Sequence, residues 1–469
     1  MSNDAELTEF LHSFRTLSEA ASRMLPQGRS QQPKLVERLT EHLGVDPASI
    51  PVVQEPLPTL RVIDADVAIE AIVADSGGGE LVGIGGGDQR WHTSLSEMLQ
   101  SGFMEFVLGP VDYSSTVTGP DTERTVVRMG LHLFTFHGSR VAVMQRGLNR
   151  QYGAMPLLEV LCADSSVAAA LLARVREEMT RLSVLRGQVV SFTASDFEPS
   201  IGEDQEAITF HRRPDVTAEQ IVLPAGTLER IERHVIGIGQ HRDALRQRGQ
   251  HLKRGVLLYG PPGTGKTHTV RHLVGAATES TVLLLSGRSL SLVSLAAQTA
   301  RALEPAIVVL EDCDLVAEER TPMGSSPLLF EVLDALDGLS ADADVVFLLT
   351  TNRVDVLEPA LAQRHGRVDL AVEIPRPDVA ARRALLDLYA GGLGFSGQTL
   401  DAVARSSDGV TASFIKEVVR RAVLFAAENG HELRDDDLNS AVQEMMADSS
   451  AITRALVGGA DEEAMGFYA

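Results

Sequence analysis

The segment that most constrains this chain is GVLLYGPPGTGKTHT, at residues 255–269. It opens with a short apolar run, Val256 to Tyr259, of the kind that forms a buried strand. Gly260 to Thr267 then fits the phosphate-loop pattern G-x-x-x-x-G-K-[ST], and a helix-compatible segment, His268 to Ala277, follows. Strand, loop and helix in this order are the context that the pattern requires, so a site for a nucleoside triphosphate is favoured over a chance glycine-rich turn.

The residue types of this loop suit a polyphosphate. Glycines let backbone N–H groups turn inward around the phosphates, and the N-terminus of the following helix adds partial positive charge. Lys266 can reach the β- and γ-phosphates, and the Thr267 hydroxyl can ligate Mg²⁺. The predicted nucleotide-binding residues are Gly260, Pro261, Pro262, Gly263, Thr264, Gly265, Lys266, Thr267 and His268.

A second element of such a site is an apolar strand that ends in carboxylates. Ile307 to Leu310, followed by Glu311 and Asp312, has this form. We expect Glu311 to act, with Thr267, through Mg²⁺ and its waters, and Asp312 to polarise the attacking water. The alternative is a strand that ends in a solvated acidic turn.

Composition excludes several other classes of protein. The 469 residues suffice for two to four domains. The formal net charge is −22 and no segment carries a stripe of basic residues, which disfavours nucleic-acid binding as the main task. Only two cysteines occur, which fits a reducing compartment. The first residues show no signal peptide, and no apolar run reaches the roughly 18 residues of a membrane span. We therefore expect a cytoplasmic protein without membrane contact.

The pattern of apolar residues divides the chain into six parts. After residue 220, apolar strands alternate with helical segments, which predicts a parallel sheet of α/β type. From residue 378 onward the pattern is helical throughout. The predicted parts are a helical segment with a proline-rich linker (1–58), a mixed α+β N-terminal domain for a client or regulator (59–200), a linker (201–220), the α/β ATPase domain (221–375), a helical lid (376–448) and a flexible tail (449–469).

Several motifs together resemble one family. GPPGTGKT, SPLLFEVLDALDGL (326–339) and LLTTNRVDVLEPALAQRHGRVD (348–369) stand in the order seen in the AAA subfamily of AAA+ ATPases. The resemblance covers residues 221–445. It implies a P-loop NTPase sheet with a helical lid, ATP and Mg²⁺ as ligands, and ATP hydrolysis.

The resemblance also implies roles for single residues. Asn352 matches the polar residue that positions water near the γ-phosphate. Arg364 and Arg367 match the arginines that act on the nucleotide of a neighbouring subunit, where they neutralise charge on the transferred phosphoryl group. Such arginines imply a homo-oligomeric ring, usually a hexamer. Residues 408–417 correspond to the family's ribose and adenine contacts.

Two departures from the family pattern bear on function. The usual order at the acidic strand is Asp-Glu, whereas Glu311 precedes Asp312 here, as in the mitochondrial ATPase that helps assemble respiratory complex III. The shorter Asp side chain in the water-activating position predicts slower hydrolysis or shifted roles. The interval 288–304 is also short and lacks the aromatic residue of unfoldase pore loops, which leaves Leu290, Leu292 or Val293 as weak peptide contacts.

The final residues Phe467, Tyr468 and Ala469 resemble the tail by which proteasomal ATPases dock into the proteasome core particle. The preceding acidic stretch can act as a tether, and the terminal carboxylate can pair with a lysine. A chance match is the alternative. Lysine occurs at only four positions, which suggests a high-GC genome, and proteasomes occur in high-GC actinobacteria.

The leading functional prediction is an ATP-hydrolysing ring that remodels or unfolds protein clients. The sequence contains no HExxH zinc-protease motif, so proteolysis would require a partner protein. The alternative is a nucleotide-gated switch or assembly scaffold with slow turnover. A nucleic-acid motor is a third class, which the uniform negative charge opposes.

Overall fold

A computed structural model describes residues 33–100, 105–149, 153–192, 208–313, 340–353 and 368–458, together with residues 13 and 338. Several predictions fall wholly or mainly on residues outside this set. They concern the N-terminal helical stretch, most of the 326–339 motif, Arg364 and Arg367, and the final residues Phe467 to Ala469. None of the described helices is long and apolar enough to cross a membrane.

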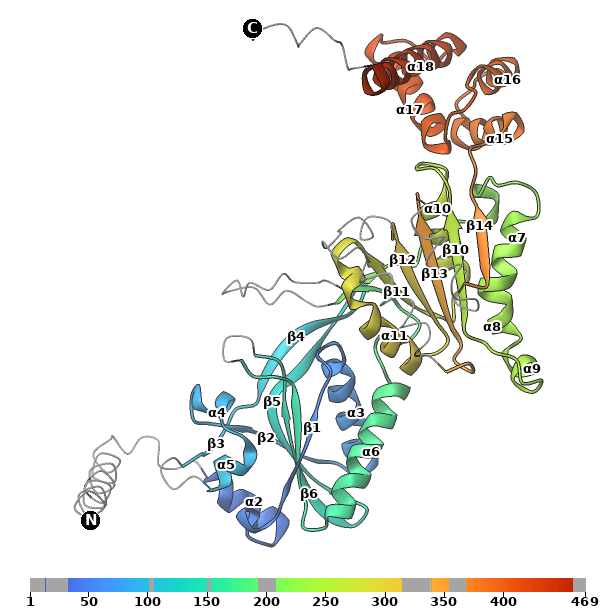
Figure 1. Cartoon of the computed structure of the whole chain (residues 1–469). Helices are drawn as coiled ribbons and strands as arrows, with labels where there is room; N and C mark the ends of the chain where they lie inside the picture. Colours follow the sequence, from blue (N-terminus) through green and yellow to red (C-terminus); the bar gives the residue numbers. More distant parts are fainter. Residues whose placement is uncertain are drawn as a thin grey trace, which may run out of the picture. The chain divides into compact units, whose positions relative to one another are not determined.

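The chain forms two compact units, the first built from most residues up to Val184 and the second from most residues after it. The first unit is a seven-stranded sheet with the order β1-β7-β6-β5-β2-β3, and β4 pairs with β5 (Figure 1). Its strands are β1 (Val52–Pro56), β2 (Gly79–Ile84), β3 (Leu108–Gly109), β4 (Asp112–Gly119), β5 (Thr122–Phe136), β6 (Ser139–Arg146) and β7 (Leu157–Leu161). Its helices are α2 (Leu35–Leu43), α3 (Val62–Asp75), α4 (Gln89–His92), α5 (Leu95–Gln100) and α6 (Ser165–Arg181).

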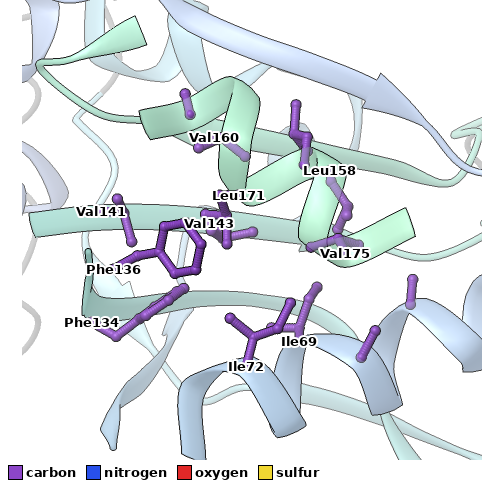
Figure 2. Close-up of a cluster of buried hydrophobic side chains, with 14 of the residues drawn as sticks. Ile69, Ile72, Phe134, Phe136, Val141, Val143, Leu158, Val160, Leu171 and Val175 are labelled. Atoms are coloured by element: carbon purple, nitrogen blue, oxygen red, sulfur yellow. The ribbon is translucent and has the colours of Figure 1, made fainter. Parts of the chain in front are cut away.

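Alternation along β5 and β6 places a core on each face of this sheet, because successive side chains of a strand point to opposite faces. One face of β5 and β6 packs against α3 and α6 through the buried side chains of Phe134, Phe136, Val141 and Val143. Figure 2 shows these side chains together with those of Ile69 and Ile72 from α3 and Leu171 and Val175 from α6. The intervening residues are buried with α2, α4 and α5 in a second cluster that includes Leu131, Leu133, Ala142 and Met144. The mixed α+β prediction for this region agrees with the structure.

The proline-rich stretch before residue 59 is not only a linker, so this part of the predicted boundary is wrong. Its residues Val52 to Pro56 form β1, which pairs antiparallel with β7. β1 is the outermost strand of its sheet, a position where proline is tolerated because one edge makes no ladder hydrogen bonds. The following segment, Val62 to Asp75, is a helix.

The second unit contains the predicted parallel α/β sheet, which confirms the fold class. Its strand order is β14-β10-β13-β12-β11-β8-β9, and all neighbours are parallel except β8 and β9. The strands are β8 (Val189–Phe192), β9 (Ile208–His211), β10 (Arg254–Tyr259), β11 (Thr281–Ser286), β12 (Ala306–Glu311), β13 (Val345–Thr351) and β14 (Leu370–Glu373). The helices before the lid are α7 (Thr227–Glu232), α8 (Ile238–Gln240), α9 (Arg242–Arg246), α10 (Lys266–Ala276) and α11 (Val293–Ala302), with a π-helical turn at Arg233–Gly237 between α7 and α8.

The predicted start of the ATPase part at residue 221 is too late. β8 joins the second sheet beside β11, and β9, inside the predicted linker 201–220, pairs with β8. In β9, Ile208 and Phe210 are buried while Thr209 is exposed. The strand was not predicted because the residues around it are polar and only its inward-facing side chains are apolar.

A buried ion pair ties the start of β10 to the start of β13. Arg254 donates to the Asp344 carboxylate at 2.8 Å, and both side chains are almost fully buried. The guanidinium also donates to the carbonyls of His234, Val235 and Leu252. Burial lowers the pKa of Arg254, and the bonds to Asp344 oppose that shift. Arg254, which stands just before the phosphate loop in the sequence, therefore stabilises the sheet.

The segment predicted to be all helical forms four helices, α15 (Val379–Ala390), α16 (Gly397–Ser406), α17 (Ala412–Glu428) and α18 (Asp435–Gly458). Three begin with a side-chain cap in which Asp378, Ser396 or Thr411 accepts a backbone N–H. Their apolar faces share one core that includes Leu386, Ile415, Val418 and Leu438.

Candidate nucleotide-binding site

The phosphate loop lies between β10 and α10, at the carboxyl end of the second sheet. β10 pairs with β13 on one side and with β14 on the other, so the loop leaves the interior of the sheet (Figure 1). Ligands of open α/β sheets bind at this end of the strands. The α10 helix begins at Lys266, directly after the loop.

Two glycines of the loop combine a positive φ with close neighbours, a backbone carbonyl at Gly260 and two side-chain hydroxyls at Gly263. Gly260 has φ +143°, and a Cβ added there would lie 2.3 Å from the carbonyl oxygen of Ile374. Gly263 has φ +76°, and its Cβ would lie 3.1 Å from the hydroxyl oxygens of both Thr411 and Ser413. A side chain at Gly260 would displace the backbone after β14, and one at Gly263 would push on the first turn of α17.

Lys266 is buried inside the loop that precedes it. Its Nζ donates to the carbonyl oxygens of Gly260 at 2.8 Å and Pro261 at 2.9 Å. The Thr264 hydroxyl donates to the same Pro261 carbonyl at 2.9 Å. The ammonium is thus held where the loop encloses it, which fixes one positive charge at the centre of the predicted phosphate site.

Glu311 ends β12 beside the first turn of α10. Its carboxylate accepts a hydrogen bond from the Thr267 hydroxyl. Burial and the nearby charge of Asp312 raise the pKa of Glu311, while Thr267 and Arg271 oppose that shift. A hydroxyl and a carboxylate are oxygen ligands of the kind that Mg²⁺ prefers, so this pair fits the predicted metal role.

Asp312 has different partners from Glu311. Its backbone adopts φ +53°, a left-handed conformation that Asp and Asn tolerate better than most residues. Its N–H donates to the Thr350 hydroxyl at 3.0 Å, and Asn352 Nδ2 donates to its Oδ1 at 3.4 Å. The predicted water-activating carboxylate and the predicted water-positioning amide therefore lie side by side at the ends of β12 and β13.

The helical lid contacts the phosphate loop directly. The N–H of Ser413 donates to the carbonyl of Gly263 at 3.0 Å, and Thr411 caps the same helix. His268 lies near the backbone of Gln220 and the charge of Lys416, and burial lowers its pKa. The segment that the resemblance assigns to ribose and adenine contacts is thus adjacent to the loop.

Some functional neighbours have only weak signals in the sequence. Thr350 ties Asp312 to β13, and the only hint is a Thr-Thr pair before Asn352. Thr411 and Ser413 stand in a short run, TAS, that reads as an ordinary helix start. The predicted residues Lys266, Thr267, Glu311, Asp312 and Asn352 are brought together around the loop, whereas Arg364 and Arg367 lie outside the described residues.

The proposed peptide contacts between β11 and β12 are largely wrong. β11 runs into a 3-10 turn (Gly287–Leu292) and then into α11. Leu290 is 1% exposed and Val293 is 0% exposed, and only Leu292 is partly accessible. The two buried side chains pack inside the unit, because the short connection leaves no loop to carry them outward.

Comparison with known proteins supports the predicted family. The model of the ATPase family associated with various cellular activities (AAA) matches residues 256–376. The chain is 35% identical over 219 residues to ATP-dependent zinc metalloprotease FtsH 2 of Sphaerobacter thermophilus (44% of this chain, 33% of that protein). It is 32% identical over 228 residues to 26S protease regulatory subunit 6A of Caenorhabditis elegans (45% and 53%). It is 30% identical over 206 residues to the proteasome-activating nucleotidase of Methanosphaerula palustris (41% and 50%).

These matches span between a third and about half of the relatives' own length. The family model covers β10 to β14, the strands that carry the phosphate loop, Glu311, Asp312 and Asn352. The AAA family uses ATP with Mg²⁺, in agreement with the oxygen ligands and the enclosed lysine described above. The second unit thus contains an AAA domain, the nucleotide-binding domain that this family model describes.

Proposed function

We propose that this protein is a cytoplasmic, ATP-hydrolysing ring, most simply a hexamer, that remodels or unfolds protein clients. The observation that carries the proposal is the division of partners at the end of β12. Glu311 is bonded to Thr267, while Asp312 faces Asn352. A binding-only site has no need for a second carboxylate held beside a polar amide.

In this proposal the loop and its lysine bind the triphosphate of ATP. Backbone N–H groups at the start of α10 and the Lys266 ammonium offset the phosphate charge. Thr267 and Glu311 would hold Mg²⁺, which when bound neutralises charge on the β- and γ-phosphates. Asp312 accepts a hydrogen bond from the attacking water and Asn352 orients that water.

In the ring, the active site of each subunit is completed by residues of the neighbouring subunit. Arg364 and Arg367 of one subunit reach the nucleotide of the next and stabilise the charge of the transferred phosphoryl group. The bond between Ser413 and Gly263 joins the lid to the loop, so a change at the phosphates changes the lid contact. The first unit recruits the client.

One observation favours the alternative of a slow switch or assembly scaffold. The segment after β11 buries Leu290 and Val293 and contains no aromatic residue. A ring that threads polypeptide needs side chains that grip it, and this segment offers little. The two functions differ in turnover, which can be measured.

The test is the ATPase rate per subunit against protein concentration, for the parent and for mixtures with Arg364→Ala. For a ring with catalysis shared between subunits, the rate per subunit rises with concentration, and the mixture falls below the rate expected from dilution alone. Arg420→Ala removes an arginine that is exposed on α17 and bonded to Glu417, and its mixtures should follow simple dilution.

A near-zero rate at every concentration, with tight ATP binding, would favour the switch. A parental rate that does not depend on concentration, and mixtures of both variants that follow dilution, would exclude shared catalysis.

Docking of a proteasome core by Phe467, Tyr468 and Ala469 is the finer part of the proposal. Two relatives are named as a 26S protease regulatory subunit and a proteasome-activating nucleotidase, which supports a protease partner. We expect deletion of residues 467–469 to abolish co-sedimentation with a proteasome core particle, while the ATPase rate is kept. Undiminished co-sedimentation of the deletion variant would refute this part.

A further inference from the structure

The first unit has a polar pocket of about 420 Å³, lined mainly by residues of α4 and of the start of β4. Its lining includes two arginines, Arg90 and Arg128, and two acidic residues, Asp88 and Asp112. Trp91 of α4, Tyr113 of β4 and Asn149 complete the polar and aromatic lining. No part of this pocket belongs to the nucleotide site, which lies in the second unit.

Trp91 is the chain's only tryptophan, and it forms the buried base of this pocket. Its side chain is part of the apolar cluster with Leu95 and Met129. Two guanidinium groups lie over the ring, that of Arg128 at 5.3 Å from the centroid and that of Arg90 at 6.0 Å. Cation–π attraction favours this placement of a guanidinium group over an indole.

The two arginines are not equivalent. Arg90 pairs with Asp112 at 2.7 Å and donates to the carbonyl of Ile84 at 2.6 Å. Arg128, in contrast, makes no ion pair or side-chain hydrogen bond with any residue in the described ranges. Its donors are therefore the ones free to receive a ligand.

Asn149 supplies the complementary group. It is 3% exposed, and its Oδ1 has no hydrogen-bond partner among the described residues. Its backbone is fixed by a pair of hydrogen bonds with Ala154. A buried acceptor without a donor is unfavourable, so its presence in a pocket indicates that a ligand N–H belongs there.

We propose that this pocket binds a client polypeptide segment that carries a carboxylate. The carboxylate accepts hydrogen bonds from Arg128, and a backbone N–H of the segment donates to Asn149 Oδ1. Tyr113, 54% exposed, provides an aromatic surface for a neighbouring apolar side chain. The inference rests on the proposed function, in which the first unit recruits protein clients.

The chemistry favours a peptide over a simple anion. A phosphate or free carboxylate satisfies Arg128 but brings no N–H to Asn149, whereas a peptide brings both groups. A nucleic acid is opposed by the net charge of −22. Since that charge also repels acidic peptides at a distance, selection has to come from this local donor set.

The single tryptophan makes the test direct. The full chain, without nucleotide, is titrated with an acetylated and amidated nonapeptide of Gly, Ser and Phe with one central Asp, and Trp91 emission is followed. We expect saturable change with this peptide and at least about tenfold weaker binding when Asn replaces Asp, because a charged hydrogen bond is lost. Arg128→Gln should weaken binding of the Asp peptide equally, and Arg128→Lys should restore part of it.

Arg176→Gln is the matched control, since it removes an exposed arginine of α6 that pairs with Glu55. Its affinity should equal that of the parent. The unliganded emission maximum and cooperative unfolding show whether each variant is folded, and calorimetric titration gives an affinity independent of the indole. Equal binding of the Asp and Asn peptides, or unchanged affinity of folded Arg128→Gln, would overturn the proposal. So would preferential binding of an oligothymidylate. Because no nucleotide is present, a failure of ATP hydrolysis would leave this result unaffected.

Discussion

Asp312→Asn is expected to bind ATP with nearly parental affinity while its hydrolysis rate falls by about 10²-fold or more, the usual contribution of a general base. The substituted amide fits the site, because Asn tolerates the left-handed backbone that Asp312 adopts. The backbone bond to Thr350 does not involve the lost carboxylate. The change therefore removes the base and retains the surrounding structure.

The measurement is single-turnover hydrolysis together with the affinity of a fluorescent ATP analogue. Glu311→Gln is the matched control, a carboxylate-to-amide change at the adjacent residue. Since Glu311 is bonded to Thr267, we expect this control to weaken Mg²⁺-dependent ATP binding instead of trapping bound ATP. Hydrolysis by Asp312→Asn at the parental rate would show that the roles of the two carboxylates are assigned wrongly.

Much of the nucleotide site could be predicted because its signals are local in the sequence. The phosphate loop stands between an apolar strand and a helix, and the acidic pair directly ends another apolar strand. Parallel strands bring their carboxyl ends to one edge, so Lys266, Asp312 and Asn352 come close without any further information. The α/β fold and the all-helical segment after it followed from the same periodicity.

Pairing between distant strands could not be predicted in the same way. β8 and β9 are only four residues long. Their place in the sheet depends on the pairing of β8 with β11, in which Val189 lies opposite Val282, about 90 residues later in the sequence. β1 contains a proline, which in isolation indicates a loop. In each case the partner strand supplies the hydrogen bonds that the local pattern lacks.

Burial explains the other main error. Leu290 and Val293 were predicted to contact a peptide because of their place between two strands, yet both are in the core. The pocket around Trp91 was also missed, since its side chains come from four separate segments of the first unit. Side chains that meet only through the tertiary fold leave no pattern in the sequence.

Lys266→Ala is expected to abolish measurable ATP binding, with an affinity loss of more than about 10²-fold. The side chain places a buried charge at the centre of the loop, where it interacts with phosphates more strongly than a solvated charge does. It also ties the Gly260 and Pro261 carbonyls together, so its loss removes both the charge and the shape of the loop.

Thermal unfolding with and without ATP and Mg²⁺ measures this loss. A ligand that binds only the folded state stabilises it by about 2.7 kcal/mol at a hundredfold excess over Kd, so the parent's Tm should rise. The Tm of Lys266→Ala should not respond to ATP. Lys34→Ala, the same substitution at an exposed lysine of the first unit that pairs with Glu105, should respond as the parent does. An equal rise in Tm for Lys266→Ala would show that backbone N–H groups alone hold the triphosphate, and the enclosed ammonium would then serve the loop's structure more than its ligand.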